Sequence, residues 1–215
     1  MGILFIDSSS KKIEFGYLED SGILLKERLD SQNNADTLIY FIREFFKINN
    51  IRFDKIEYVS LSNGPGSFTG LRISSAIAKA ICYSKGSRFI ELSTLDVIAN
   101  KKKTFKKIVP LVFSNTKTNE FYYSEYIIKE DKIKRTSDYK INMLENIIKD
   151  DALYLLNEKI TGNFPEQFKN MLTDVSELSN IDSMNELTRA SIEENKFGDY
   201  KTSEPFYMKD FVPNN

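Results

Sequence analysis

The residues with the clearest chemical potential form a glycine-rich loop, NGPGSFTGLR, at positions 63–72. Its glycines Gly64, Gly66 and Gly70 precede an apolar helix, and backbone N–H groups at a helix start can hold an anion. No Walker A lysine follows the last glycine, and the spacing is one residue longer than that of a dinucleotide fingerprint. Two interpretations remain open: an anion or nucleotide contact at Gly64, Gly66 and Ser67, or a tight structural turn.

Asp7 is a second candidate for nucleotide contact. It ends the apolar segment ILFID immediately before three serines, where actin-like ATPases present an acidic residue and a phosphate-facing hairpin. The serines include no glycine that would let the backbone approach a phosphate closely. Nucleotide binding at Asp7 is therefore the minor interpretation, beside an ordinary strand end.

The composition excludes several classes of enzyme. The 215 residues contain no histidine and one cysteine, Cys82, so Ser-His-Asp and Cys-His nucleophile chemistry and the usual zinc sites are absent. Carboxylate, lysine, tyrosine or hydroxyl chemistry, or a magnesium-type metal, would remain. We predict no catalytic residue, metal or cofactor.

The charge and hydropathy predict a cytoplasmic chain with no membrane contact. The net charge of −1 is not the basic excess typical of a nucleic-acid-binding domain, so any contact with a polyanion must be local. No apolar run is long enough to span a bilayer.

The first part of the chain predicts a mixed sheet. Three strands in succession precede alternating helices and strands, in the order β-β-β-α-β-α-β-α. The strands are expected at 3–7, 12–19, 22–29, 55–62 and 88–92, and the helices at 33–50, from Ser67 onward and at 94–102. This α/β order is the layout of a ribonuclease H-like, actin-type half-domain with helices on both faces of the sheet.

A second strand-rich series predicts a second, related subdomain. We place the boundary near residue 104, giving subdomains 1–104 and 105–215, with the last residues packing back on the first. The later strands are expected at 108–115, 119–129, 131–136 and 152–157, and the later helices at 141–149, 165–173 and 182–196. The lysine-rich stretch 101–107 is interpreted as a solvated linker, with contact to a tRNA backbone as the minor alternative.

Two helices carry more apolar surface than one sheet face requires. The helix after the glycine loop is apolar on nearly every side, and Arg72 and Lys79 form its polar stripe. Two interpretations remain open: burial between the two halves of the chain, or an interface with a partner. The residues assigned to such an interface are Leu38, Ile39, Ile42, Phe45, Phe46, Phe68, Arg72, Ile73, Ala76, Lys79 and Ala80.

The segment GPGSFTGLRISSAIAKA closely resembles the signature of the bacterial TsaB family. ILFIDSSS, LSTLDVIA and EPFYMKDF match further landmarks of that family in order, so the resemblance runs from about residue 3 to 211. It implies an actin-like (ASKHA) fold and a noncatalytic subunit that supports a catalytic TsaD subunit. TsaD transfers threonylcarbamoyl to the tRNA adenosine beside the anticodon, and a TsaE-like ATPase joins the larger assembly.

The resemblance also places the partner helices at about 35–47 and 67–82, with tRNA reached indirectly through the complex. Two departures are visible: Asn34-Ala35 stands where family members often have a histidine, and SNTKTNEFY replaces the usual DAR before EVY. Lys117 is therefore a weak substitute for the family arginine. Two rivals stay open: an actin-like ATP-dependent enzyme such as a small-molecule kinase, and a plain homodimer that uses the same helices.

Overall fold

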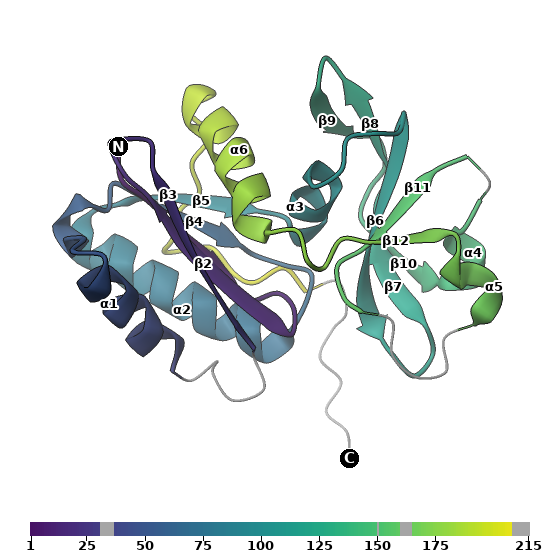
Figure 1. Ribbon diagram of the computed structural model, residues 1–215, viewed down its shortest axis with the longest axis horizontal. Coiled ribbons are helices and arrows are strands. Elements are labelled where there is room, and N and C mark those ends of the chain that lie inside the picture. The colour runs from purple at the N-terminus through teal and green to yellow at the C-terminus, as the bar shows by residue number, and fades with distance from the viewer. Residues whose placement is uncertain (31–36, 150, 160–164, 208–215) are drawn as a thin grey trace.

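Two β-sheets, each flanked by helices, lie side by side in the computed structural model, which describes residues 1–30, 37–149, 151–159 and 165–207. Helices α1 (Leu38–Ile48) and α2 (Phe68–Lys85) cover one face of the first sheet, and α6 (Asn180–Glu193) covers the other (Figure 1). Within these residues, no helix combines the length and the apolar character needed to cross a membrane.

The first sheet confirms the predicted half-domain. Its strand order is β3-β2-β1-β4-β5, with β1 to β3 antiparallel and β1, β4 and β5 parallel. The strands are β1 (Ile3–Asp7), β2 (Lys12–Leu18), β3 (Leu24–Asp30), β4 (Tyr58–Ser62) and β5 (Arg88–Leu92). The mixed pairing follows from tight reversals between the first three strands and helical crossovers before the last two.

Local signals fix the ends of α2. Ser67 is its N-cap, and its side chain accepts a hydrogen bond from the Gly70 N–H. Gly86, at φ 69°, ends the helix in the left-handed conformation that glycine adopts readily. A short 3₁₀ turn (Phe53–Lys55) and α3 (Thr94–Asn100) complete this half. The predicted helix start at 33 lies outside the described residues.

The second sheet has the order β10-β7-β6-β11-β12, and β8 pairs with β6 and β9. Its strands are β6 (Lys107–Asn115), β7 (Glu120–Tyr123), β8 (Tyr126–Lys129), β9 (Lys132–Arg135), β10 (Lys140–Met143), β11 (Leu153–Leu156) and β12 (Leu172–Asp174), with short helices α4 (Leu144–Ile147) and α5 (Glu166–Lys169).

Three predicted elements in this half are wrong. The single strand expected at 119–129 is two strands with a break at Ser124 and Glu125, where the Ser124 hydroxyl donates to the Ser137 carbonyl and the Glu125 N–H donates to the Ser137 hydroxyl. The helix expected at 141–149 is a strand followed by a single helical turn, and that expected at 165–173 is the short α5 followed by β12. Apolar periodicity does not separate such short strands from helical turns.

The segment that contains α6 and Gly198 returns to the first sheet. Ile181 and Met184 of α6 pack with Ile3 and Phe5 in a core beneath the sheet. Gly198 N–H donates to the Phe89 carbonyl at 2.8 Å. The chain crosses between the sheets around residue 104, and a domain boundary at that point stays a proposal.

Candidate partner interface and interdomain cleft

The glycine loop is packed against the hairpin that follows β1. A Cβ on Gly66 would lie 2.2 Å from the Ser9 carbonyl oxygen, and one on Gly70 would lie 2.1 Å from that of Ser8. The Ser67 N–H donates to the Ser9 carbonyl at 2.7 Å, and the Ser8 hydroxyl donates to the Gly70 carbonyl at the same distance. These contacts make the loop a structural elbow, and anion binding at Gly64, Gly66 and Ser67 stays a secondary proposal.

Asp7 is fully buried and already has partners. Its carboxylate accepts a hydrogen bond from the Ser9 N–H at 2.9 Å and a second from the side-chain amide of Asn180, at the start of α6. A ligand would have to displace Asn180 to reach the second oxygen. The structure therefore gives Asp7 a role in holding α6 against the first sheet.

The outward stripe of α2 consists of an arginine, two alanines and a tyrosine. Arg72, Ala76, Ala80 and Tyr83 are exposed and follow each other at helical spacing. The opposite side of the helix is buried: Ala78, Ile81 and Cys82 belong to the core between the helices and the sheet, and Ile73 and Ile77 are half-buried against it. The inner side of α2 therefore packs within the first half of the chain, not between the two halves, and a partner interface on the outward stripe stays a proposal.

Four residues assigned to the interface belong to the core instead. Leu38, Ile42, Phe45 and Phe46 of α1 are 0 to 7% exposed and pack on the sheet, so they cannot contact a partner directly. The four residues recur at helical spacing and so share one face of α1. This face packs on the apolar surface of the sheet. The outer face carries Ile39, at 47% exposure.

Three exposed apolar residues were not assigned to the interface from the sequence. These are Tyr40, Ile48 and Tyr83, of which Tyr83 is 79% exposed. Tyr83 follows Ala76 and Ala80 at helical spacing, and this spacing is the sequence signal that could have assigned it to the interface.

Three other assigned residues, Phe68, Arg72 and Lys79, contact the segment 204–207 of this chain. The Arg72 guanidinium lies 4.0 Å from the Phe68 ring centroid and donates to the Tyr207 hydroxyl at 3.2 Å. Lys79 pairs with Glu204 at 3.6 Å. The residues that remain for a partner are Ile39, Ile73, Ala76 and Ala80, joined by Tyr40, Ile48 and Tyr83.

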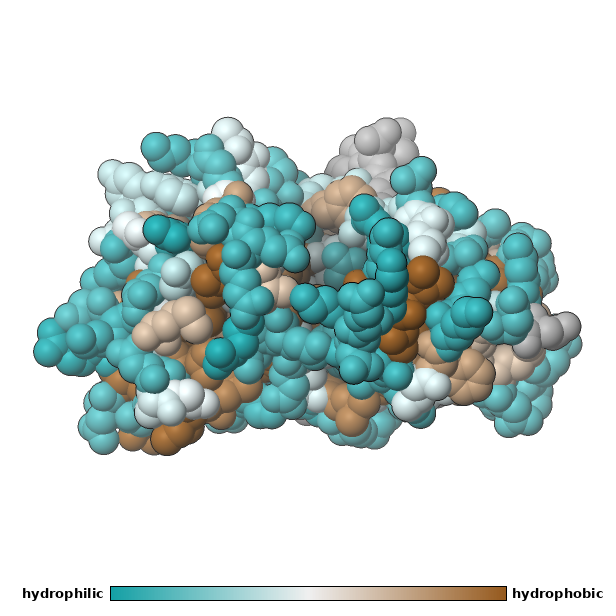
Figure 2. Space-filling view, turned by 90° about the horizontal axis from the view of Figure 1, so that it is seen from above, coloured by the Kyte–Doolittle hydropathy of each residue, from teal (hydrophilic) through white to brown (hydrophobic). Residues whose placement is uncertain are grey.

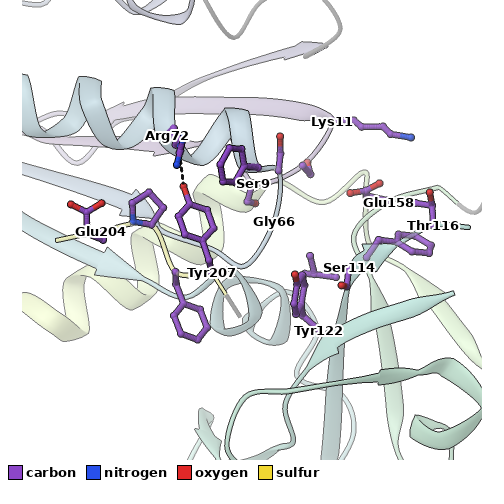
Figure 3. A pocket seen from close by; sticks show the side chains of 17 residues that line it. Ser9, Lys11, Gly66, Arg72, Ser114, Thr116, Tyr122, Glu158, Glu204 and Tyr207 are labelled. Atoms are coloured by element: carbon purple, nitrogen blue, oxygen red, sulfur yellow. Dashed lines mark hydrogen bonds between the residues drawn. The ribbon is translucent and has the colours of Figure 1, made fainter. Parts of the chain in front are cut away.

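A cleft of about 1170 Å³ separates the two halves (Figure 3). The hairpin at 9–11 and the start of α2 form one wall, β6 and Tyr122 form the other, and residues 204–207 close one end. Burial raises the pKa of Glu158 in this cleft, and the charge of Lys11 opposes the shift. The cleft can admit a small molecule.

This geometry does not favour the alternative function, an actin-like ATP-dependent enzyme. Asp7 and the glycine loop are already bonded within the protein. Among residues 1–30, 37–149, 151–159 and 165–207, no cluster of three acidic or thiol side chains could hold a metal ion. Burial raises the pKa of the Cys82 thiol to about 12, which removes thiolate chemistry near neutral pH.

The lysine-rich linker is only partly solvated, so that interpretation is wrong for three of its residues, among them Lys107, which pairs with Glu125 at 3.0 Å. The Lys101 ammonium donates to the Asn157 side chain at 2.6 Å and to the carbonyls of Val175 and Leu178 at 3.1 and 2.6 Å. Lys103 pairs with Glu186. No sequence signal separated these lysines from their solvated neighbours.

Comparison with known proteins identifies the family. A family model described as "TsaD: tRNA N6-adenosine threonylcarbamoyltransferase" matches residues 28–212. Curated relatives carry the name "tRNA threonylcarbamoyladenosine biosynthesis protein TsaB". The chain belongs to this family, in its TsaB branch.

The TsaB relatives are distant but cover most of the chain. The protein of Buchnera aphidicola subsp. Schizaphis graminum is 29% identical over 68% of this chain and 72% of its own length. The Bacillus subtilis TsaB is 24% identical over 81% and 76%, and the Escherichia coli TsaB is 21% identical over 75% and 70%.

A solved structure supports the fold. YeaZ from Pseudomonas aeruginosa superimposes with a TM-score of 0.76 at 13% identity, over 96% of this chain and all of that one. The actin-like fold expected from the TsaB resemblance is confirmed. Of the two departures from the TsaB pattern, Asn34-Ala35 lies outside the described residues, and Lys117 lies in an exposed turn after β6.

Proposed function

We propose that this TsaB-family chain is a noncatalytic subunit of tRNA threonylcarbamoyladenosine biosynthesis. It binds and supports a TsaD-like catalytic subunit, which transfers threonylcarbamoyl to the adenosine adjacent to the anticodon. The family match and the names of the TsaB relatives support the pathway. The missing imidazole, the inert buried thiol and the internally bonded glycine loop support a role without catalysis.

The observation that carries the partner role is the exposed apolar face of α1 and α2. Ile39, Tyr40 and Tyr83 are large side chains held in water by helices whose inner faces already fill the core. Ala76 and Ala80 lie on the same outward surface and permit close approach of another helix. Burying aromatic and aliphatic anchors around small residues is typical of protein interfaces.

Co-purification with a TsaD-like subunit tests this proposal. Ala76→Arg places a long charged side chain on the stripe, so association is expected to weaken at least about tenfold, since an unpaired charge is costly to bury. Gln167→Arg, an exposed helical position in the second half, is the matched control and should leave association unchanged. Failure of the unmodified chain to associate, or equal behaviour of both variants, would exclude this interface.

Three finer parts of the proposal have separate tests. A TsaE-like ATPase joins the assembly, and the isolated chain forms a homodimer through the same face; the mass in solution with and without each partner checks both. Cytoplasmic localisation is checked by cell fractionation.

A further inference from the structure

The β8–β9 hairpin carries three lysines on one face. In the antiparallel pairing, Tyr126 lies opposite Arg135, Ile127 opposite Lys134, Ile128 opposite Ile133 and Lys129 opposite Lys132. Directly paired residues point to the same face of a sheet, and successive residues alternate. Two cross-strand pairs therefore share each face of the hairpin.

The core identifies which face is turned inward. Tyr126, Ile128 and Ile133 pack in a core cluster with residues of α3. Lys129, Lys132 and Lys134 are consequently on the opposite face, and all three are exposed. Figure 1 shows the hairpin rising above the rest of the second sheet, and Figure 2, seen from above, shows hydrophilic side chains gathered over the middle of the molecule beside a hydrophobic strip.

More lysines extend this face along the sheet. Lys107 lies opposite Ile127 in the β6–β8 pairing, and so points to the same side as the three hairpin lysines. It pairs with Glu125 at 3.0 Å, and this contact lowers the pKa of Glu125, with the charges of Lys140 and Lys149 acting in the same direction. We call Lys107, Lys129, Lys132, Lys134, Lys140 and Lys149 the basic face.

The acidic residues of this region do not neutralise it. Glu125 is shared with Lys107, Asp151 acts on that same lysine, and Glu130 and Asp131 form the tip of the hairpin. Lys129, Lys132, Lys134 and Lys140 make no ion pair with any residue that the structure describes; the charge of Lys132 helps to lower the pKa of Glu194, but that carboxylate is paired with Lys196. The chain as a whole has a net charge of −1, so this is a local concentration of positive charge.

This arrangement of lysines does not stabilise the fold. Like charges placed directly opposite each other across two strands are destabilising, and Lys129 and Lys132 have that relationship. Lys132 and Lys134 are two residues apart on one strand, which places their Cα atoms about 7 Å apart on the same face. Such a row of ammonium groups can contact successive phosphates of a polyanion and release its counterions together.

We propose that the basic face binds the phosphate backbone of RNA. Because the proposed function supplies tRNA as the substrate of the complex, this inference rests on that function and adds a direct RNA contact to it. The contact is independent of sequence, since lysines on a sheet surface reach phosphates and not base edges. It lies on the second sheet, whereas the proposed partner interface lies on α1 and α2 of the first.

Fluorescence anisotropy with labelled unmodified tRNA and the full chain, over a series of salt concentrations, tests the proposal. The variant Lys129→Gln/Lys132→Gln/Lys134→Gln removes three unpaired charges. The magnitude of the slope of log Kobs against log salt is expected to fall by about 2 to 3, since each of the three lost contacts removes about 0.7 to 0.9. The matched control, Lys55→Gln/Lys85→Gln/Lys201→Gln, changes the net charge equally at exposed positions outside the basic face and should keep the slope.

The outcomes separate this inference from the proposed function. Loss of RNA affinity in the basic-face variant, with TsaD association unchanged, supports the RNA contact. Equal losses in both triple variants, or no loss in either, would overturn it. Binding of the unmodified chain to anionic phospholipid vesicles but not to tRNA would overturn it as well. Because tRNA binding is measured on the chain alone, failed association with TsaD would count against the proposed function only.

Discussion

The Lys101 ammonium lies 2.6 Å from Oδ1 of Asn157, and this contact joins the end of α3 to the residue after β11. The same ammonium donates to the carbonyls of Val175 and Leu178, in the segment that leads into α6. One side chain thus ties together the first half, the second sheet and the returning helix. Removing it would leave three acceptors at the junction of the two halves without this donor.

Lys101→Met is expected to lower the free energy of unfolding by about 1–3 kcal/mol, because the acceptors lose their donor while the apolar stem is retained. Urea unfolding monitored by circular dichroism measures the loss. Lys102→Met is the matched control, since Lys102 makes no ion pair with the described residues, and it should change stability by less than about 0.5 kcal/mol. Equal losses in the two variants would show that the junction does not depend on Lys101.

The same lysine predicts a dependence of stability on pH. Burial lowers the pKa of Lys101 from 10.5 to about 8. Between these values the unfolded chain binds the proton more strongly than the folded chain, so this group favours folding more as the pH rises. The stability of the unmodified chain minus that of Lys101→Met should therefore rise between about pH 8 and pH 10.5. A constant or falling difference would contradict the shifted pKa.

Gly70→Ala tests the packing of the glycine loop. Alanine is ordinarily favoured over glycine inside a helix, by about 1 kcal/mol. Here the new Cβ would lie 2.1 Å from the Ser8 carbonyl oxygen, so we expect a net destabilisation of about 1–3 kcal/mol, measured by urea unfolding. At Gly22 a Cβ has open space and only the positive φ of 86° opposes it, so Gly22→Ala should cost about 1 kcal/mol. A stabilised Gly70→Ala variant would show that the hairpin moves aside easily.

Substitutions at two neighbouring residues of α1 distinguish an effect on folding from an effect on association. Leu38 is 0% exposed, and Leu38→Ala is expected to cost about 2–5 kcal/mol of stability through the cavity it leaves. Ile39 is 47% exposed, so Ile39→Ala should cost less than about 1 kcal/mol while weakening association with a TsaD-like subunit. Urea unfolding and pull-down titration measure the two effects. An Ile39→Ala variant that binds as tightly as the unmodified chain would remove this residue from the interface.

The sequence by itself determined the first half of the fold and the family. The strands at 3–7 and 88–92 and the start of α2 near Ser67 follow from signals in neighbouring residues, and the sequence alone therefore predicts them. The segment from Gly64 to Ala80 carried the family resemblance for a related reason, since it is one continuous stretch.

Only the tertiary structure decided which residues of those elements are buried and which are exposed to a partner. The arc of α1 is apolar over Leu38 and Ile39 alike, and the position of the sheet alone buries the first and exposes the second. Nothing in the sequence distinguishes Lys101 from the neighbouring lysines, and only the fold brings Asn157 and Leu178 beside it. The lysines of β8 and β9 become one basic face through strand pairing. Burial and charge density depend on contacts between residues far apart in the chain, whereas periodicity reports only on near neighbours.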